Sequence, residues 1–208
     1  MKKNKQEAEM TRLAILQSAL DVFCEKGYSK TTFDEIAKRI LLTKGAVYWH
    51  FRNKPDMVAA LINEYATKKR AYLMQKVPAI CCVADLIAYF KYAAEFITKD
   101  ENNLKFAFFT ACQMEWSEGL LENIAEKVAE NKKDFLQRLK EGLTFLQKSG
   151  EIPQNYDTDK LIFLIHAAWI GVLEACLSQG CPEKLSETIE ENLNLIFEGL
   201  KRISYASK

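Results

Sequence analysis

Residues 31–51 read TTFDEIAKRILLTKGAVYWHF, and this stretch contains the start signals of two short helices. Thr32 and Glu35 stand in capping-box spacing, in which the hydroxyl and the carboxylate satisfy each other's backbone donors at a helix start. Thr43 can cap the next helix, which is predicted to run to Phe51. Two short helices joined by a brief turn predict a helix-turn-helix motif.

The second of these helices carries more aromatic residues than one buried stripe can hold. Val47 and Phe51 lie four residues apart and are predicted to pack on the preceding helices. Aromatic residues on a helix are more often core than contact residues, but here a capped helix precedes them and basic residues surround them. We therefore expect a recognition surface on the opposite side, formed by Lys44, Gly45, Tyr48 and Trp49.

Helical patterns cover the rest of the chain. The first helix is predicted to end at Gly27, a residue suited to a left-handed cap, and Asn53 can start a long fourth helix. A later long helix stops at Gly150, and no strand pattern competes with the helical periodicity. The sequence predicts an all-α fold of about nine helices.

Charge divides the chain unevenly although the net charge is only +1. Residues 1–75 carry 14 Lys and Arg against 8 Asp and Glu, whereas the remainder carries 15 against 20. A basic N-terminal part suggests that this part meets a polyanion, although a solvated face would give the same imbalance.

The chemistry of the recognition surface suits double-stranded DNA. Lys44 can reach a guanine edge or a phosphate, Gly45 lets the backbone approach the groove, and Ala46 can touch a thymine methyl group. Side-chain donors to phosphate groups are expected from Thr31, Thr32, Tyr48, Trp49, His50 and Lys54.

Residues 10–57 resemble the DNA-binding domain of the TetR (tetracycline repressor) family, especially its multidrug-efflux regulators. The resemblance rests on ALDVFCEKGYSKTTFDEIAKR followed by TKGAVYWHFRNKPDM. It implies a helix-turn-helix DNA-binding domain over residues 1–54 and a helical ligand-binding and dimerisation domain over residues 55–208. By this resemblance the DNA-contacting positions are Thr32, Thr43, Lys44, Gly45, Tyr48, Trp49, His50 and Lys54.

One departure from the family pattern falls in the turn of the motif. The family usually has Ala-Gly-Val where this chain has Ile40, Leu41 and Leu42. If Leu41 takes the positive φ of the missing glycine, it carries strain on the order of 1 kcal/mol.

The last two predicted helices favour a homodimer. Residues 161–177 are apolar on nearly every side, and the final helix adds an apolar stripe. Together they offer more hydrophobic surface than one small bundle obviously buries, although a core within one chain is the alternative. The stripe consists of Leu185, Ile189, Leu193, Ile196 and Leu200.

The family resemblance implies an inducer pocket in the C-terminal helices, for a small hydrophobic or amphiphilic molecule that releases a repressor from a palindromic operator. The open alternative is a regulator without an inducer. His166 is a lone histidine on an apolar face, which is more often a satisfied core residue than a ligand contact. The candidate pocket residues are Tyr89, Tyr92, Phe109, Gln113, Trp116, His166, Trp169 and Glu174.

An enzyme is the rival class, with His166 and Glu174 as acid and base. These residues lie over two turns apart, with no nucleophile or phosphate loop beside them. No C-x-x-C pair occurs, so we expect free and mostly buried thiols, with neither a metal nor a cofactor. If any cysteines form a zinc or redox site, Cys176 and Cys181 are the least improbable pair.

The cellular compartment is expected to be the cytoplasm. The charged start MKKNKQEAEM lacks the apolar core of a signal peptide. No apolar run is expected to reach the roughly 18 residues of a membrane span, so no membrane is expected among the partners.

Overall fold

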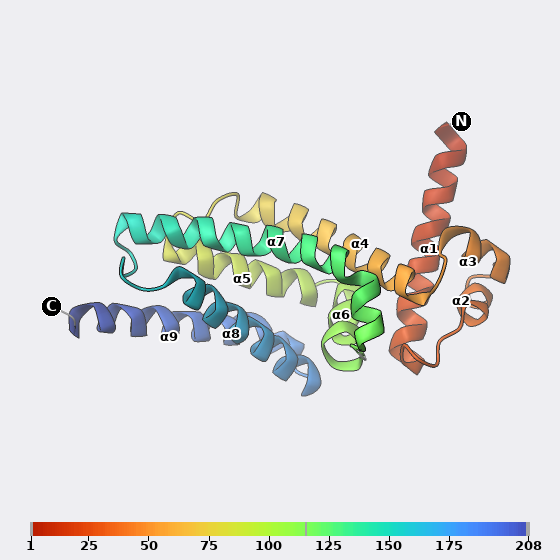
Figure 1. Cartoon of the computed structure of the whole chain (residues 1–208). Helices are drawn as coiled ribbons and strands as arrows, with labels where there is room; N and C mark the ends of the chain where they lie inside the picture. The colour runs from red at the N-terminus through yellow and green to blue at the C-terminus, as the bar shows by residue number, and fades with distance from the viewer. Residues whose placement is uncertain (1, 115, 207–208) are drawn as a thin grey trace. The chain divides into compact units, whose positions relative to one another are not determined.

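The computed structural model describes residues 2–114 and 116–206, and every regular element in these ranges is helical (Figure 1). The predicted all-α fold of about nine helices is confirmed, with one π-helical and one 3₁₀ segment in addition. The elements are α1 (Lys2–Lys26), α2 (Phe33–Arg39), α3 (Lys44–His50), α4 (Lys54–Lys76), α5 (Val83–Thr98), α6 (Glu101–Phe108), η1 (Phe109–Gln113), α7 (Glu118–Ser149), α8 (Thr158–Ser178), η2 (Pro182–Lys184) and α9 (Leu185–Ala206).

The chain divides into two compact units. Unit 1 comprises Met1–Ala66 and Glu101–Glu130, and unit 2 comprises Thr67–Asp100 and Asn131–Lys208. The backbones of α4 and α7 begin in unit 1 and end in unit 2. These units are defined by packing, so the division into functional domains at residue 54 stays a prediction.

Local capping explains where the helices of unit 1 begin and end. Gly27 follows α1 with φ 83°, and its N–H donates to the carbonyl of Phe23 at 2.8 Å. Thr32 and Glu35 form the predicted capping box at α2. The Asn53 side chain accepts from the N–H of Asp56 at 2.8 Å at the start of α4. These predicted helix signals are confirmed.

The core of unit 1 joins the helix-turn-helix to α1 and α6. Val47 of α3 is fully buried among apolar side chains of α1 and α2. Phe23 stacks on Phe109 with ring centroids 5.1 Å apart. The Lys105 ammonium lies 3.0 Å from the Asp21 carboxylate and so links α6 to α1. The motif is therefore held on a packed scaffold.

Unit 2 is a helical bundle in which α9 packs against both α5 and α8. The predicted apolar stripe of α9 is buried inside the unit, with Ile196 partly buried. The stripe is therefore core of the single chain, and our expectation that it adds surface for a second copy was wrong.

Exposed apolar side chains lie on α8 instead. Phe163 is 74% exposed, Leu195 of the adjoining α9 is 68% exposed, and Leu164 and Ile170 also face outward. The buried positions of α8 follow a different stripe that includes Ile165 and Cys176. A large apolar face of this helix is thus left uncovered by its own chain.

The same helix corrects our expectation about membrane-length apolar segments. In the described ranges, α8 is long and apolar enough by length and composition to cross a membrane, with a mean hydropathy of 1.9 over its most apolar window. Asp159 and Lys160 stand in its first turn, and only His166 and Glu174 interrupt the apolar sequence that follows. A core helix of a water-soluble protein passes the same test.

Candidate functional site

The short helix α3 has one buried face and one exposed face. Its start is capped by Thr43, whose hydroxyl oxygen accepts from the N–H of Ala46 at 3.2 Å. Val47 is buried, whereas Tyr48 is 52% exposed and Trp49 is 73% exposed. Lys44 and Gly45 are exposed on the outward side. The predicted orientation of the helix is confirmed, and an outward row of polar and aromatic groups results.

The turn before α3 takes the conformation that the sequence made us expect. Leu41 has φ 57°, and among the described residues it alone has positive φ without being glycine. Its N–H donates to Lys38 O at 3.2 Å, and the N–H of Leu42 donates to Ala37 O at 2.9 Å. These bonds form a Schellman motif that ends α2. Leu41 therefore occupies the usual glycine position, with its side chain 94% exposed.

The starts of α2, α3 and α4 enclose a hollow of about 380 Å³ in unit 1, which we call the basic hollow. Five predicted contact residues line it, together with Arg52, which sequence reasoning missed. Arg52 is exposed in the turn between α3 and α4, and its basic character beside the motif was the available signal. The lining residues are Thr31, Thr32, Phe33, Lys44, Tyr48, Arg52, Asn53 and Lys54.

Besides the capping residues Thr32 and Thr43, two predicted contact residues are already engaged inside unit 1. Thr31 is only 2% exposed, and its hydroxyl donates to Gly27 O at 2.8 Å. The Lys54 ammonium donates to Tyr28 O at 2.8 Å and to Ser29 O at 3.0 Å, and burial lowers its pKa. Thr31 is therefore a structural residue, and Lys54 clamps the loop that precedes α2.

The remaining predicted positions are exposed or half-buried. His50 is half-buried, and the centroid of its ring lies 4.5 Å from that of the Trp49 ring. Burial, and to a smaller extent the Arg12 guanidinium, lowers the pKa of His50, while Glu9 opposes the shift. The direction of this shift favours the neutral form of the His50 imidazole. Ala46 is half-buried beside the exposed Gly45.

The predicted pocket residues fall into both units. Phe109, Gln113 and Trp116 belong to unit 1, where Phe109 is core and the Gln113 amide donates to Cys24 O at 3.2 Å. Trp116 is partly exposed, and its indole N–H donates to Thr110 O at 3.2 Å. These three positions are part of the packing of unit 1.

Unit 2 brings three of the other candidates into one aromatic cluster. Phe90 lies 5.5 Å from both Tyr89 and Trp169, and Phe135 lies 5.5 Å from His166, measured between ring centroids. Phe90 and Phe135 are also in edge contact at 6.3 Å. We call these five residues the unit 2 aromatic cluster. Sequence reasoning missed Phe90 and Phe135, although Phe135 stands four residues before Leu139 on the buried side of α7.

A cationic group adjoins this cluster. The Arg138 guanidinium lies 5.3 Å from the centroid of the Tyr89 ring and also donates to Val77 O and to the Met74 sulfur. Its Nε is buried and has no hydrogen-bond partner among the described residues. Tyr92 lies partly buried on α5, and Glu174 is exposed on α8, so Glu174 is not part of the cluster.

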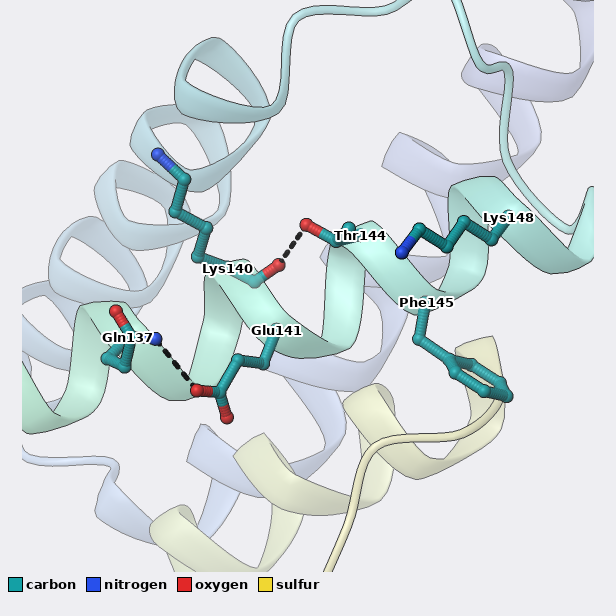
Figure 2. Close-up of a pocket in the computed structure, with 6 residues that line it drawn as sticks. All are labelled: Gln137, Lys140, Glu141, Thr144, Phe145 and Lys148. Carbon is teal, nitrogen blue, oxygen red and sulfur yellow. Dashed lines mark hydrogen bonds between the residues drawn. The ribbon is translucent and has the colours of Figure 1, made fainter.

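A second hollow, of about 570 Å³, lies along α7 and contains none of the predicted pocket residues. Figure 2 shows that its lining comes from one face of this helix. Two of its hydrogen bonds stay within α7, from Gln137 to Glu141 at 2.7 Å and from Thr144 to the carbonyl of Lys140 at 2.6 Å. The Lys140 ammonium also donates to the Asp159 carboxylate of α8 at 3.0 Å. We interpret this hollow as an exposed helix surface.

Comparison with known proteins relates the helix-turn-helix to a defined family. The sequence model of the family described as "Bacterial regulatory proteins, tetR family" matches residues 15–61. The probable acrEF/envCD operon repressor of Escherichia coli K12 is 30% identical over 184 residues, which cover 83% of this chain and 79% of the relative.

Two solved structures are similar in fold along most of the chain. The complex of SmeT with triclosan has a TM-score of 0.77 at 24% identity and covers 91% of each chain. SmeT is the repressor of a Stenotrophomonas maltophilia multidrug efflux pump. FadR from Bacillus subtilis in complex with stearoyl-CoA has a TM-score of 0.77 at 21% identity, covering 90% of this chain and 98% of that one. At these identities the likeness shows the fold.

Proposed function

The chain belongs to the tetR family of bacterial regulatory proteins, and on this basis we propose that it is a ligand-responsive transcriptional repressor. Family membership makes it a DNA-binding transcription regulator and not an enzyme. In the proposal it binds a palindromic operator as a homodimer, and a small hydrophobic molecule releases it. A relative named as an operon repressor supports repression as the direction of control.

The outward face of α3 carries the proposal for DNA. Lys44, Gly45, Tyr48 and Trp49 are exposed on a helix whose opposite face is anchored in the core. In a helix-turn-helix the second helix enters the major groove with its N-terminal residues at the base edges. Lys44 and Gly45 are the first two residues of α3, so they read bases, and the basic hollow receives the phosphate backbone.

The exposed apolar face of α8 supports a homodimer. One recognition helix reads too few bases to be selective, and two-fold symmetry doubles the contacts, with half-sites about 34–36 Å or somewhat more apart. A second copy of α8 and α9 would cover Phe163, Leu164, Ile170 and Leu195. A dimer interface accounts for the apolar face of α8, so this helix need not lie in a membrane. We therefore place the protein in the cytoplasm.

The unit 2 aromatic cluster supports a ligand site. Aromatic walls with a few polar groups suit small lipophilic molecules, and Arg138 beside Tyr89 offers a polar handle for an amphiphile. Triclosan in SmeT and stearoyl-CoA in FadR are hydrophobic or amphiphilic molecules bound by proteins of this fold.

The DNA-binding part of the proposal is tested by three substitutions in α3. An operator is first selected from genomic fragments, and its affinity is then measured by fluorescence anisotropy. We expect Lys44→Ala and Gly45→Ala to weaken binding at unchanged melting temperature, because a Cβ at Gly45 meets nothing closer than 3.8 Å within the chain. The buried control, Val47→Ala, should lower the free energy of unfolding by about 2 kcal/mol.

Two results for these variants would contradict the proposal. If Lys44→Ala and Gly45→Ala leave affinity unchanged, α3 does not read the operator. If both lower the melting temperature as Val47→Ala does, this face belongs to the core.

A further inference from the structure

The end of α8 holds two cysteines in a defined backbone motif. Gly180 follows the helix with φ 68°, and its N–H donates to Leu177 O at 3.2 Å. The N–H of Cys181 donates to Cys176 O at 2.9 Å. These two hydrogen bonds define a Schellman motif, which closes the last turn of the helix.

The motif brings the two cysteine residues together. In a Schellman motif the residue after the left-handed glycine commonly contacts the residue whose carbonyl it caps. Cysteines occupy both of these positions here, joined by the backbone hydrogen bond from the Cys181 N–H to the Cys176 carbonyl. The described residues include all six cysteines, and none of the six forms a disulfide. The end of α8 therefore places two free cysteines at paired positions of one backbone motif.

The surroundings give the two thiols different reactivity. Cys176 is buried, and burial is the main reason that its pKa is raised, with Cys181 and the Glu183 carboxylate adding to the shift and a Thr188 hydrogen bond opposing it. Cys181 is half-buried in the loop and is the more accessible thiol. A reagent in solution therefore reaches Cys181 more readily than Cys176.

We propose that Cys176 and Cys181 are a modification site that closes to a reversible intrachain disulfide when the protein meets a hydroperoxide. The proposal is independent of DNA binding and of the proposed ligand. Cys176 lies on the buried stripe of α8, away from the exposed Phe163 and Ile170, so the reaction is compatible with a dimer formed through that exposed face.

The chemistry balances in two steps. The Cys181 thiolate attacks one peroxide oxygen, so an S–O bond forms, the O–O bond breaks, and the leaving hydroxide or alkoxide takes a proton. The sulfur of Cys176 then attacks the Cys181 sulfenic acid, forming the S–S bond and expelling water with the thiol proton. Two thiols are oxidised by two electrons, and one hydroperoxide is reduced to water and an alcohol, or to two waters.

Accessibility alone predicts a different result. Cys81 and Cys112 are more exposed than either member of the pair. If exposure decided the outcome, these two would be oxidised first and the pair would stay reduced. If placement in the motif decides the outcome, the pair closes to a disulfide while Cys81 and Cys112 can still be alkylated.

Peptide mass spectrometry of the full chain tests the proposal. Trypsin cleaves after Lys160 and Lys184 and releases both cysteines in one peptide. After brief exposure to hydrogen peroxide and alkylation without reductant, this peptide should be lighter by two hydrogen atoms and carry no alkyl group. Dithiothreitol before alkylation should restore two alkyl groups. A peptide that stays doubly alkylated after peroxide, or that carries sulfinic acid at Cys181, overturns the proposal.

Two variants separate the motif from general reactivity. Cys81→Ser combined with Cys112→Ser should close the pair at the wild-type rate. Gly180→Ala strains the left-handed position and should slow closure by roughly fivefold or more, although no atom of the chain crowds the new Cβ. Closure of Gly180→Ala at the wild-type rate, with its helix content unchanged by circular dichroism, would show that the motif does not position the thiols.

Discussion

At the scale of single residues, Leu41 shows how the turn of the motif departs from its usual chemistry. A leucine with φ 57° stands where a helix-ending motif favours glycine, and its side chain gains little from burial because it is 94% exposed. The strain is therefore offset by the packing on either side of the turn, where Val47 and Ile36 are buried.

This strain gives a stability prediction. Leu41→Gly should raise the free energy of unfolding by about 1 kcal/mol, because glycine adopts positive φ without a steric penalty. Leu41→Asn, which tolerates this conformation better than leucine, should give a smaller gain. Urea denaturation of the three proteins measures both differences. A loss of stability in Leu41→Gly would mean that the leucine side chain supports the turn.

Single residues also show which features of the site could be predicted from the sequence. The buried and exposed faces of α3 followed from helical spacing alone, since Val47 and Phe51 stand four apart. The hydrogen bond from the Thr31 hydroxyl to Gly27 O was not predicted, because helical spacing does not reveal a bond made across the loop between α1 and α2. Phe135 and Arg138 were missed because they stand near the unit 2 candidates only through packing of α7 on α5 and α8.

At the scale of elements, caps were the most informative sequence signals. Thr32, Thr43 and Asn53 each begin a helix through a local side-chain hydrogen bond, which depends only on neighbouring residues. The apolar stripe of α9 was identified correctly, but what covers it depends on the tertiary arrangement of α5 and α8. Capping signals therefore predicted where helices begin, whereas the packing of one helix against another had to be observed in the structure.

The start of α4 gives a prediction with two readouts. Lys54 clamps two carbonyls of the loop before α2 and also lines the basic hollow. Lys54→Ala should lower the free energy of unfolding by about 1 kcal/mol, because two charge-assisted hydrogen bonds at a partly exposed site are lost. The slope of log affinity against log salt should also fall by about 0.9, because one cation leaves the phosphate path.

Lys44→Ala is the matched control for this experiment. Lys44 is exposed and lines the same hollow, so its loss should change affinity without changing stability. Chemical denaturation and operator titrations at several salt concentrations give both numbers for each variant. An unchanged salt slope in Lys54→Ala would assign this lysine to the fold alone.

At the scale of the whole molecule, α8 has an apolar face that its own chain does not cover. Only 33% of its most apolar window is buried, which is low for the core helix of a self-contained domain. In a two-fold symmetric dimer each copy presents the same apolar face of α8 to the other, so the two faces can cover each other.

The dimer prediction follows from this face. Wild-type protein should be a dimer by light scattering at micromolar concentration, and Phe163→Glu should be a monomer because it places charge in the apolar interface. Phe145→Glu is the control, since Phe145 is an exposed phenylalanine in the α7 hollow shown in Figure 2. A monomeric wild type, or a dimeric Phe163→Glu, would contradict this assignment.

Release of DNA requires that the ligand distinguish two states of the dimer. A molecule that binds both states equally shifts nothing, however tightly it binds. The ligand must favour the dimer whose recognition helices are spaced wrongly for the operator. The continuous backbones of α4 and α7 are the elements through which unit 2 can influence unit 1.

The most direct measurement is an operator titration of the dimer with and without a saturating ligand. A thermal-shift screen of lipophilic cations, bile-salt-like amphiphiles and flat aromatic compounds supplies the ligand. If His166→Ala and Trp169→Ala lose the shift in melting temperature that this ligand causes, the ligand binds at the unit 2 aromatic cluster. A coupling of about 1–3 kcal/mol predicts operator affinity that is roughly 5- to 150-fold weaker with ligand, while both variants retain wild-type affinity without it. A ligand placed at this cluster that leaves operator affinity unchanged would contradict ligand-controlled repression and favour a regulator without an inducer.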